Sequence, residues 1–239
     1  MKFEVDLHTH TIASGHAYST LQENINYAIN NEIKLLGITE HTNGMVGGAQ
    51  DIYFANYRAI PRKFGSLELL MGAEVNIMDF DGTLDVNGDL LKEMDIVIAS
   101  MHPLCIPFGN IEQNTNAIIK AMENKYINII GHPGDPRYPI DVKEIVQTAI
   151  KTNTLIEINN ASLNPGGFRV GSKDYIVNIL NLCKSMDFPV ILGSDAHFST
   201  AIGVFNFIEP VLEEVNFPKE LIINSSVNNF KSFISQNNI

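Results

Sequence analysis

The stretch Phe3-Glu4-Val5-Asp6-Leu7-His8-Thr9-His10 opens the chain as a short apolar run that ends in two histidines. A helical pattern follows in residues 21–31, where apolar side chains recur at helical spacing. A second apolar run, residues 35–39, again stops beside a histidine, His41. Strand, helix and strand in this order are typical of a parallel sheet.

The same alternation continues along the chain and predicts an α/β fold. We predict seven strands, over residues 3–7, 35–39, 67–75, 95–100, 127–130, 154–158 and 189–192. We predict helices over residues 21–31, 114–124, 142–152, 173–185 and 205–215. Residues 79–85 contain an Asp-Gly turn and predict an inserted hairpin, and residues 218–234 predict an amphipathic cap. Seven such units either close a barrel or leave an open sheet, and in both cases ligands gather at the carboxyl ends of the strands.

Length and composition indicate an ordinary soluble globular protein, with 239 residues, 45% of them hydrophobic and 18% charged. One domain over residues 1–239 is expected, because α/β barrels commonly span about 200–250 residues. No stretch approaches about 18 uninterrupted apolar residues, and the acidic N-terminus lacks the apolar core of a secretion signal. We therefore expect no membrane segment and a cytoplasmic location. Cys105 and Cys183 lack metal-type spacing and are expected to be buried fillers.

The formal net charge of −11 makes a long nucleic acid an unexpected partner, because nucleic-acid binders normally carry a basic stripe. A small anionic substrate remains compatible with this charge if local cations reverse the field within a cleft. The oligomeric state is left open by the sequence.

All seven histidines fall at or just after the carboxyl end of a predicted strand, or in the first loop: His8, His10, His16, His41, His102, His132 and His197. Residues two apart on a strand project to the same side, so His8 and His10 are expected to converge. Asp6 shares their parity and either orients a ligand or is satisfied by backbone N–H groups.

Two carboxylates, Glu74 and Asp195, end the third and seventh predicted strands. A buried carboxylate needs a cationic partner, and lysine and arginine are scarce in these segments. Metal ions therefore fit better, and imidazole and carboxylate ligands suit zinc, manganese or iron. Nine ligands at four to five bonds per ion predict about three divalent ions.

Two loops offer contacts to a phosphorylated substrate. Arg169 and Ser172 lie in a glycine-rich loop that runs into a predicted helix, which favours an anion site, although a solvated arginine in a capped loop would have the same sequence. Arg137 is a weaker candidate. Asn159 and Asn160 end the sixth strand and either bond to substrate or to metal-bound water, or cap the next loop.

Six motifs resemble the PHP family, named for polymerase and histidinol phosphatase: Asp6-Leu7-His8-Thr9-His10-Thr11, His16-Ala17-Tyr18-Ser19-Thr20, Ile38-Thr39-Glu40-His41, Gly72-Ala73-Glu74-Val75-Asn76, Gly131-His132-Pro133-Gly134 and Gly193-Ser194-Asp195-Ala196-His197. The similarity is strongest to the branch of small trinuclear-zinc phosphatases of the YcdX type. Glu40 stands where that branch often has Asp, a difference that bears on the groups behind the ligands and not on the number of ligands.

The resemblance implies a distorted (β/α)7 TIM-like barrel with a trinuclear metal site at the carboxyl ends of its strands. One ion would take His8, His10, Glu74 and Asp195, a second Glu74, His102 and His132, and a third His16, His41 and His197. Glu74 would bridge the first two ions. Asp195, His197 and Glu74 would be the catalytic residues.

The expected activity is hydrolysis of phosphate monoesters, with a metal-bridging hydroxide as nucleophile attacking phosphorus in line. The alternatives are a phosphodiesterase or 3′ exonuclease, a histidinol-phosphatase-like activity, and a non-catalytic module that uses metal for stability. The physiological ester is not selected by the sequence.

Overall fold

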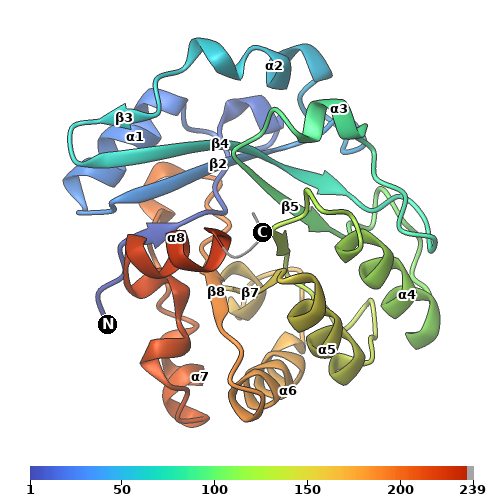
Figure 1. Ribbon diagram of the computed structural model, residues 1–239. Coiled ribbons are helices and arrows are strands. Elements are labelled where there is room, and N and C mark those ends of the chain that lie inside the picture. The colour runs from blue at the N-terminus through green and yellow to red at the C-terminus, as the bar shows by residue number, and fades with distance from the viewer. Residues whose placement is uncertain (236–239) are drawn as a thin grey trace.

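Seven parallel strands form the body of the sheet, each hydrogen-bonded to the next in the order β1-β2-β4-β5-β6-β7-β8 (Figure 1). The computed structural model describes residues 1–235. The strands are β1 (Val5–Asp6), β2 (Leu35–His41), β4 (Leu67–Asn76), β5 (Ile96–Ser100), β6 (Ile129–Ile130), β7 (Leu155–Asn159) and β8 (Val190–Gly193). All seven predicted strands are present, with ends that differ by one to two residues in most cases.

The sheet curls until its first and last strands meet, which makes a nearly closed barrel. Beyond β1 and β8, Thr9 pairs with Ala196 in a parallel bridge, and the backbone N–H of Asp195 donates to the carbonyl oxygen of His8 at 3.0 Å. The expected distorted (β/α)7 TIM-like barrel is therefore confirmed.

At the opposite end of this seam a side chain replaces direct strand pairing. The fully buried Asn224 accepts the backbone N–H of Leu192 at 2.7 Å, and its amide nitrogen donates to the carbonyl oxygens of Val5 and Leu192, both at 2.8 Å. Asn224 lies in the segment after α7, so the C-terminal cap holds β1 and β8 together.

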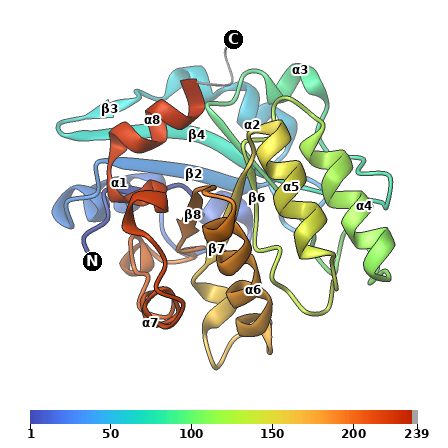
Figure 2. The same ribbon diagram turned by 60° about the horizontal axis from the view of Figure 1, so that its bottom comes forward.

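Helices cover the outside of the barrel, and α4, α5 and α6 lie side by side there (Figure 2). The helices are α1 (Leu21–Asn30), α2 (Asp51–Ala55), α3 (Gly88–Leu91), α4 (Ile111–Met122), α5 (Val142–Thr152), α6 (Ser172–Ser185), α7 (Glu209–Glu214) and α8 (Val227–Ser235). None of the helices in residues 1–235 is long and apolar enough to cross a bilayer.

Two predicted helix boundaries were wrong for local reasons. Helix α4 begins at Ile111, because Asn110 caps it and Gln113 returns a hydrogen bond to the Asn110 backbone. Helix α7 begins at Glu209 and not at residue 205, in agreement with Pro210, whose missing N–H is tolerated only in the first turn. The prediction missed the short helices α2 and α3.

The predicted inserted hairpin is confirmed. Ile77 and Leu84 form an antiparallel bridge, the N–H of Met78 donates to the carbonyl oxygen of Thr83 at 2.8 Å, and Gly82 adopts a φ of 75° at the turn. A second hairpin was not predicted: β3 (Lys63–Phe64) pairs antiparallel with the start of β4.

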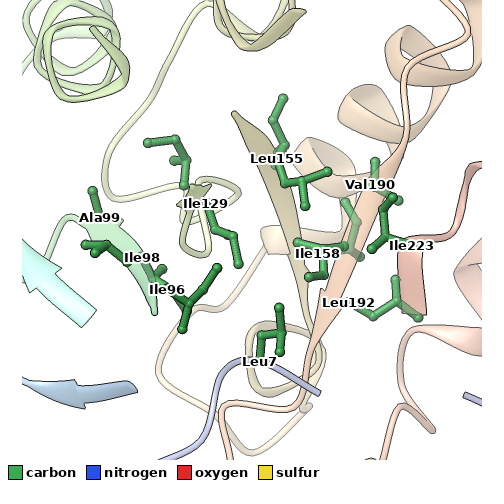
Figure 3. Packing of buried hydrophobic residues seen from close by; sticks show 14 of the residues in the cluster. Leu7, Ile96, Ile98, Ala99, Ile129, Leu155, Ile158, Val190, Leu192 and Ile223 are labelled. Atoms are coloured by element: carbon green, nitrogen blue, oxygen red, sulfur yellow. The ribbon is translucent and has the colours of Figure 1, made fainter. Parts of the chain in front are cut away.

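The core fills the barrel and the layer between strands and helices. Figure 3 shows Leu7, just after β1, packed together with Ile98, Ile129, Ile158 and Leu192 from four other strands. Every residue of β2, β5, β7 and β8 is buried, as predicted for strands covered on both faces. Cys183 is buried as predicted, whereas Cys105 is only partly buried because it lies in the loop after β5. One domain over residues 1–239 stays a prediction, and residues 236–239 lie outside the described part of the chain.

Replacing Asn224 with leucine is expected to lower the free energy of unfolding by about 3 kcal/mol or more, because three buried backbone groups lose their partner. Urea denaturation followed by circular dichroism measures this change. The matched control is Asn228→Leu at an exposed position of α8, with an expected change within about 0.5 kcal/mol. Equal stability of the two variants would contradict a bridging role for Asn224.

Candidate metal centre

Glu74 lies at the centre of the candidate site. It lies in the buried second half of β4, has no exposed surface, and faces ring nitrogens of five histidines. Its carboxylate oxygens lie 3.3 Å from His8 Nε2, 3.5 Å from His10 Nε2, 3.0 Å from His41 Nδ1, 3.3 Å from His102 Nε2 and 2.9 Å from His132 Nε2. Histidines from four different strand ends therefore meet at one carboxylate on a fifth strand.

Asp195 forms a second anionic point of the site. Its Oδ1 atom lies 3.4 Å from His10 Nε2, 3.6 Å from His8 Nε2 and 3.5 Å from His197 Nδ1. The residue adopts a φ of 57°, in the left-handed region, where aspartate is better tolerated than most residues. This conformation follows directly after β8 and turns the carboxylate toward the histidines that follow β1.

Both carboxylates are held in their ionised form. Burial by itself would raise the pKa of Glu74, but His8, His102 and His41 hold it well below its usual range. Burial likewise opposes ionisation of Asp195, whose pKa is nonetheless held well below its usual value by His8 and His10, among others. Two buried negative charges thus face one cluster of imidazoles.

The outer part of the site is formed by three imidazole rings near the surface. The His16 ring centroid lies 4.9 Å from that of His41 and 4.8 Å from that of His197. His197 has 31% of its side chain exposed, and His16 is exposed, so this group forms the mouth of the site.

Three groups of side chains bring their ligand atoms within 4.8 Å of one another: His8, His10 and Glu74; His41, Glu74 and His102; and His10, His41 and His197. These groups contain six of the nine predicted ligands. The other three lie beside them: His132 at Glu74, Asp195 at His8 and His10, and His16 at His41 and His197. The division of these side chains among three ions stays a prediction; His41 faces Glu74 as well as the rings of His16 and His197.

Several ligand atoms at this site are buried without a hydrogen-bond partner. Within residues 1–235 they are His8 Nε2, His10 Nε2, His41 Nδ1 and Glu74 Oε2. An unpaired buried polar atom is costly, and proteins rarely leave one without a reason. Nitrogen and oxygen donors aimed at a common point are the chemistry that zinc, manganese or iron accepts, so the residues fit a metal cluster.

A carboxylate that the sequence analysis missed supports the innermost histidine. Glu157 Oε1 lies 2.6 Å from His8 Nδ1, and Glu157 Oε2 accepts the backbone N–H of His132 at 2.7 Å. The imidazole Nδ1 is thereby the donor, which leaves Nε2 free to face Glu74. A Cβ at Gly193 would lie 1.7 Å from Glu157 Oε1, so glycine is required on the neighbouring strand.

The charge on His8 follows from these neighbours. Burial opposes protonation, but Glu157, Glu74 and Asp195 raise the pKa of His8 well above its usual value. Burial instead dominates at His10 and His102: the pKa of His10 is well below its usual value, and that of His102 falls to about 4. A lone charged acid in the otherwise apolar residues 155–158 was the available sequence signal for Glu157.

Glu40 and Ser14 hold the first loop behind the site. The Ser14 hydroxyl donates to Glu40 Oε2 at 2.6 Å, accepts the backbone N–H of His41 at 3.0 Å and lies 3.1 Å from His10 Nδ1. Glu40 therefore acts behind the ligands, through Ser14.

Asp6 takes the second of its two predicted roles. It accepts backbone N–H groups of His8, Ser194 and Gly203, and burial raises the pKa of its carboxyl to about 6. Asp6 is thus a buried acid satisfied by backbone groups.

The two candidate arginines have different surroundings. Arg169 Nη1 lies 3.3 Å from Asp195 Oδ2 and 3.3 Å from Ser162 Oγ, so its guanidinium borders the site. Arg137 forms a close pair with the buried Asp135, with Nη2 to Oδ2 at 2.6 Å and Nε to Oδ1 at 3.0 Å. Arg169 is thus a basic neighbour of Asp195, a contact that was not predicted from the sequence.

The remaining candidates are engaged in local structure. The buried Ser172 donates its hydroxyl to the carbonyl oxygen of Arg169 at 2.7 Å. Asn159 accepts two hydrogen bonds from Ser162 through Oδ1 and donates to Asp195 Oδ2 at 3.3 Å, so it both caps the loop and borders the site. Asn160 accepts the backbone N–H of Phe207 and has a structural role.

Comparison with known proteins gives a family model and curated relatives that match most of the chain. Residues 6–161 match the model of the PHP domain. The chain is 48% identical over 225 residues to a probable phosphatase of Clostridium novyi, covering 94% of this chain and 91% of that protein. It is 44% identical over 234 residues to a probable phosphatase of Caldicellulosiruptor saccharolyticus, covering 98% and 97% of the two chains.

Two solved structures share the fold at low sequence identity. The crystal structure of histidinol phosphate phosphatase from Lactococcus lactis, in complex with zinc, L-histidinol and phosphate, aligns with a TM-score of 0.58 and 14% identity, over 90% of this chain and 94% of that one. A chain in the cryo-EM structure of archaeal ribonuclease P with mature tRNA aligns with a TM-score of 0.59 and 15% identity, over 97% of this chain and 91% of that one. Because the family model spans most of the chain and the probable phosphatases align over nearly all of it, the protein belongs to the PHP domain family.

Proposed function

We propose that this protein is a metal-dependent phosphatase that hydrolyses small phosphate monoesters and holds about three divalent ions, zinc first among them. The proposed ligands are His8, His10, His16, His41, Glu74, His102, His132, Asp195 and His197. The observation that carries the proposal is the set of buried ligand atoms at Glu74 that have no hydrogen-bond partner within residues 1–235.

Ions bound here would supply a nucleophile from water at neutral pH and positive charge for the phosphoryl oxygens. Other residues of the chain hold and orient the proposed ligand side chains. Glu157 fixes His8 with Nε2 inward, Ser14 does the same for His10, and Asn159 steadies Asp195. The partly exposed His197 stands at the mouth, where a substrate would enter.

Arg169 is the proposed phosphate contact among the described residues. Its side chain borders Asp195 and is 16% exposed, so N–H groups of the guanidinium fork remain near the entrance. Ser172 holds the loop that carries Arg169. Arg137 has its guanidinium turned to Asp135, which favours a supporting role for it.

The relatives support a phosphatase over the other classes. The curated relatives described above are named probable phosphatases, and the Lactococcus structure contains zinc, a small alcohol and phosphate. The ribonuclease P chain shows that the fold also occurs in a nucleic-acid complex. A net charge of −11 favours a small ester over a long polyanion for this chain.

Glu74→Gln is expected to lower kcat/KM for an aryl phosphate by about 100-fold or more, because it removes the carboxylate shared by the inner ligands. The assay uses zinc- or manganese-loaded protein and a panel of metabolite phosphates. The matched control is Glu68→Gln at the opposite end of β4, where Glu68 pairs with Lys231, and it should retain wild-type activity.

Three outcomes would overturn this function. The first is less than one ion per wild-type chain in elemental analysis. The second is a metal-loaded protein that releases no phosphate from any ester. The third is shortening of labelled single-stranded DNA while monoesters are untouched. The last result would favour the exonuclease alternative, and loss of melting temperature with chelator but no turnover would favour a non-catalytic module.

Arg169→Met is expected to weaken competitive inhibition by inorganic phosphate by about 10- to 100-fold, the loss expected for a charge-assisted hydrogen bond. Arg137→Met should leave that inhibition unchanged, because its guanidinium is engaged with Asp135. Metal content is measured alongside, since Arg169 also touches Asp195. Equal effects of the two variants would refute the distinction between them.

A further inference from the structure

Asp85 closes the inserted hairpin of residues 77–85 and lies behind His102, where the mechanism proposed above gives it no role. Its Oδ2 atom accepts the Thr42 hydroxyl at 2.6 Å, the Gly44 backbone N–H at 2.9 Å and the Asn76 side-chain amide at 2.7 Å. Its Oδ1 atom accepts the Asn76 backbone N–H at 2.8 Å. One carboxylate thus receives four hydrogen bonds.

These contacts determine which way the Asn76 amide points. An ionised carboxylate only accepts, so the Asn76 group that faces Asp85 must be the NH₂. The same NH₂ lies 3.1 Å from the Thr42 hydroxyl, whose hydrogen is already given to Asp85. The Asn76 carbonyl oxygen is left on the other side, 2.7 Å from His102 Nδ1.

The orientation of Asn76 in turn sets the tautomer of His102. A carbonyl oxygen accepts only, so His102 Nδ1 must carry the hydrogen. His102 Nε2 then carries the lone pair and faces Glu74 Oε1 at 3.3 Å. Neutral imidazole binds a metal ion through such a lone pair, and a hydrogen on the other ring nitrogen is the usual support.

We propose that Asp85 is a positioning residue which, through Asn76, fixes His102 with Nε2 available to a divalent ion. The inserted hairpin, which extends the loop after β4, therefore also supports the ion-binding position of His102. This inference rests on the proposed function, because it needs the site to bind metal. Asp85 touches no ligand atom and acts only through the amide of the fully buried Asn76.

A simple packing role for Asp85 is the competing explanation. The same carboxylate anchors the loop after β2 through Thr42 and Gly44, and a Cβ at Gly44 would lie 2.5 Å from Asp85 Oδ2. Loss of this anchor would disturb the loop without changing the His102 tautomer. The experiment must therefore observe the tautomer itself.

Asp85→Asn separates these roles, because it keeps the size and replaces one accepting oxygen by a donating NH₂. If that NH₂ faces Asn76, the Asn76 amide turns over and presents its own NH₂ to His102 Nδ1. His102 then carries its hydrogen on Nε2, the atom that faces Glu74. The matched control is Asp79→Asn in the same hairpin, where exposed Asp79 accepts hydrogen bonds from Asp81 and Thr83 within the turn.

Two readouts are measured on the full chain. Competition titration with a zinc chelator gives the affinity of each zinc equivalent, and nitrogen-15 NMR of the imidazoles, with His102→Gln for assignment, gives the tautomer. For Asp85→Asn we expect one zinc equivalent to weaken by about 10- to 100-fold, the usual cost of losing such a supporting contact. We also expect the His102 hydrogen to move from Nδ1 to Nε2, whereas Asp79→Asn should match wild type in both.

A double-mutant cycle tests the path through Asn76. In an Asn76→Leu background the additional Asp85→Asn substitution should change zinc affinity no further, because the connection to His102 is already broken. Asn76→Leu also serves if Asp85→Asn does not fold, since its own loss of one zinc equivalent is then the expected result.

Opposite results overturn the inference. An unchanged His102 tautomer in Asp85→Asn, equal zinc affinity in that variant and wild type, or fully additive effects in the double mutant would each assign Asp85 to packing alone. These results leave the phosphatase proposal intact if the wild type binds zinc and turns over esters. A wild type that binds no zinc would overturn both.

Discussion

An ionised carboxylate with no exposed surface is the constraint on which the site depends. Glu74 has five imidazole nitrogens within 3.5 Å, and its charge persists because those neighbours oppose the effect of burial on its pKa. Burying such a charge costs several kcal/mol unless a positive group compensates it. The raised pKa of His8 gives one such charge from the chain, held between Glu74 and Glu157. A divalent ion at this point would replace that proton, so we expect metal binding to release protons, as it does wherever ligands must be deprotonated.

The parallel barrel explains how distant residues reach this carboxylate. In the register of the sheet His41 on β2 lies directly beside Glu74 on β4, and Glu74 lies beside Ile98 on β5. Parallel strands all end at the same rim, so a side chain near each strand end is brought to a common point without long loops. The seam between β1 and β8 completes the ring, because the bridge from Thr9 to Ala196 brings the histidines after β1 next to Asp195.

The side chains that the sequence singled out as ligands do lie together, because their signal is local; their role as ligands stays a proposal. A histidine or acid directly after an apolar run has a defined place in a βα unit, so the convergence of these side chains followed from strand ends, except for His16, which lies in the first loop. The supporting groups have no local signal. Glu157 needs Gly193 on the next strand to make room for it, and Asp85 reaches His102 through Asn76, nine residues earlier, by way of a hairpin. The side chain of Asn224 is similarly defined only by strands that lie far away in the sequence.

Two helices were missed because periodicity gave too little information. Helix α2 has five residues and α3 four, which is too short for an apolar stripe to repeat. The division of the proposed ligands among ions stays a prediction. It depends on side-chain rotamers, and His41 lies between Glu74 and the outer rings.

Charge balance at the rim links metal binding to substrate binding in the proposed phosphatase. The guanidinium groups of Arg137 and Arg169 face the carboxylates Asp135 and Asp195, so they add no surplus positive charge. Glu74 lies behind them as a further anion in a chain whose net charge is −11. A phosphate dianion would therefore approach a site that repels it, unless bound cations reverse the local field. On this argument the ions must bind first, and the affinity for phosphate should follow the metal occupancy more closely than it follows either arginine.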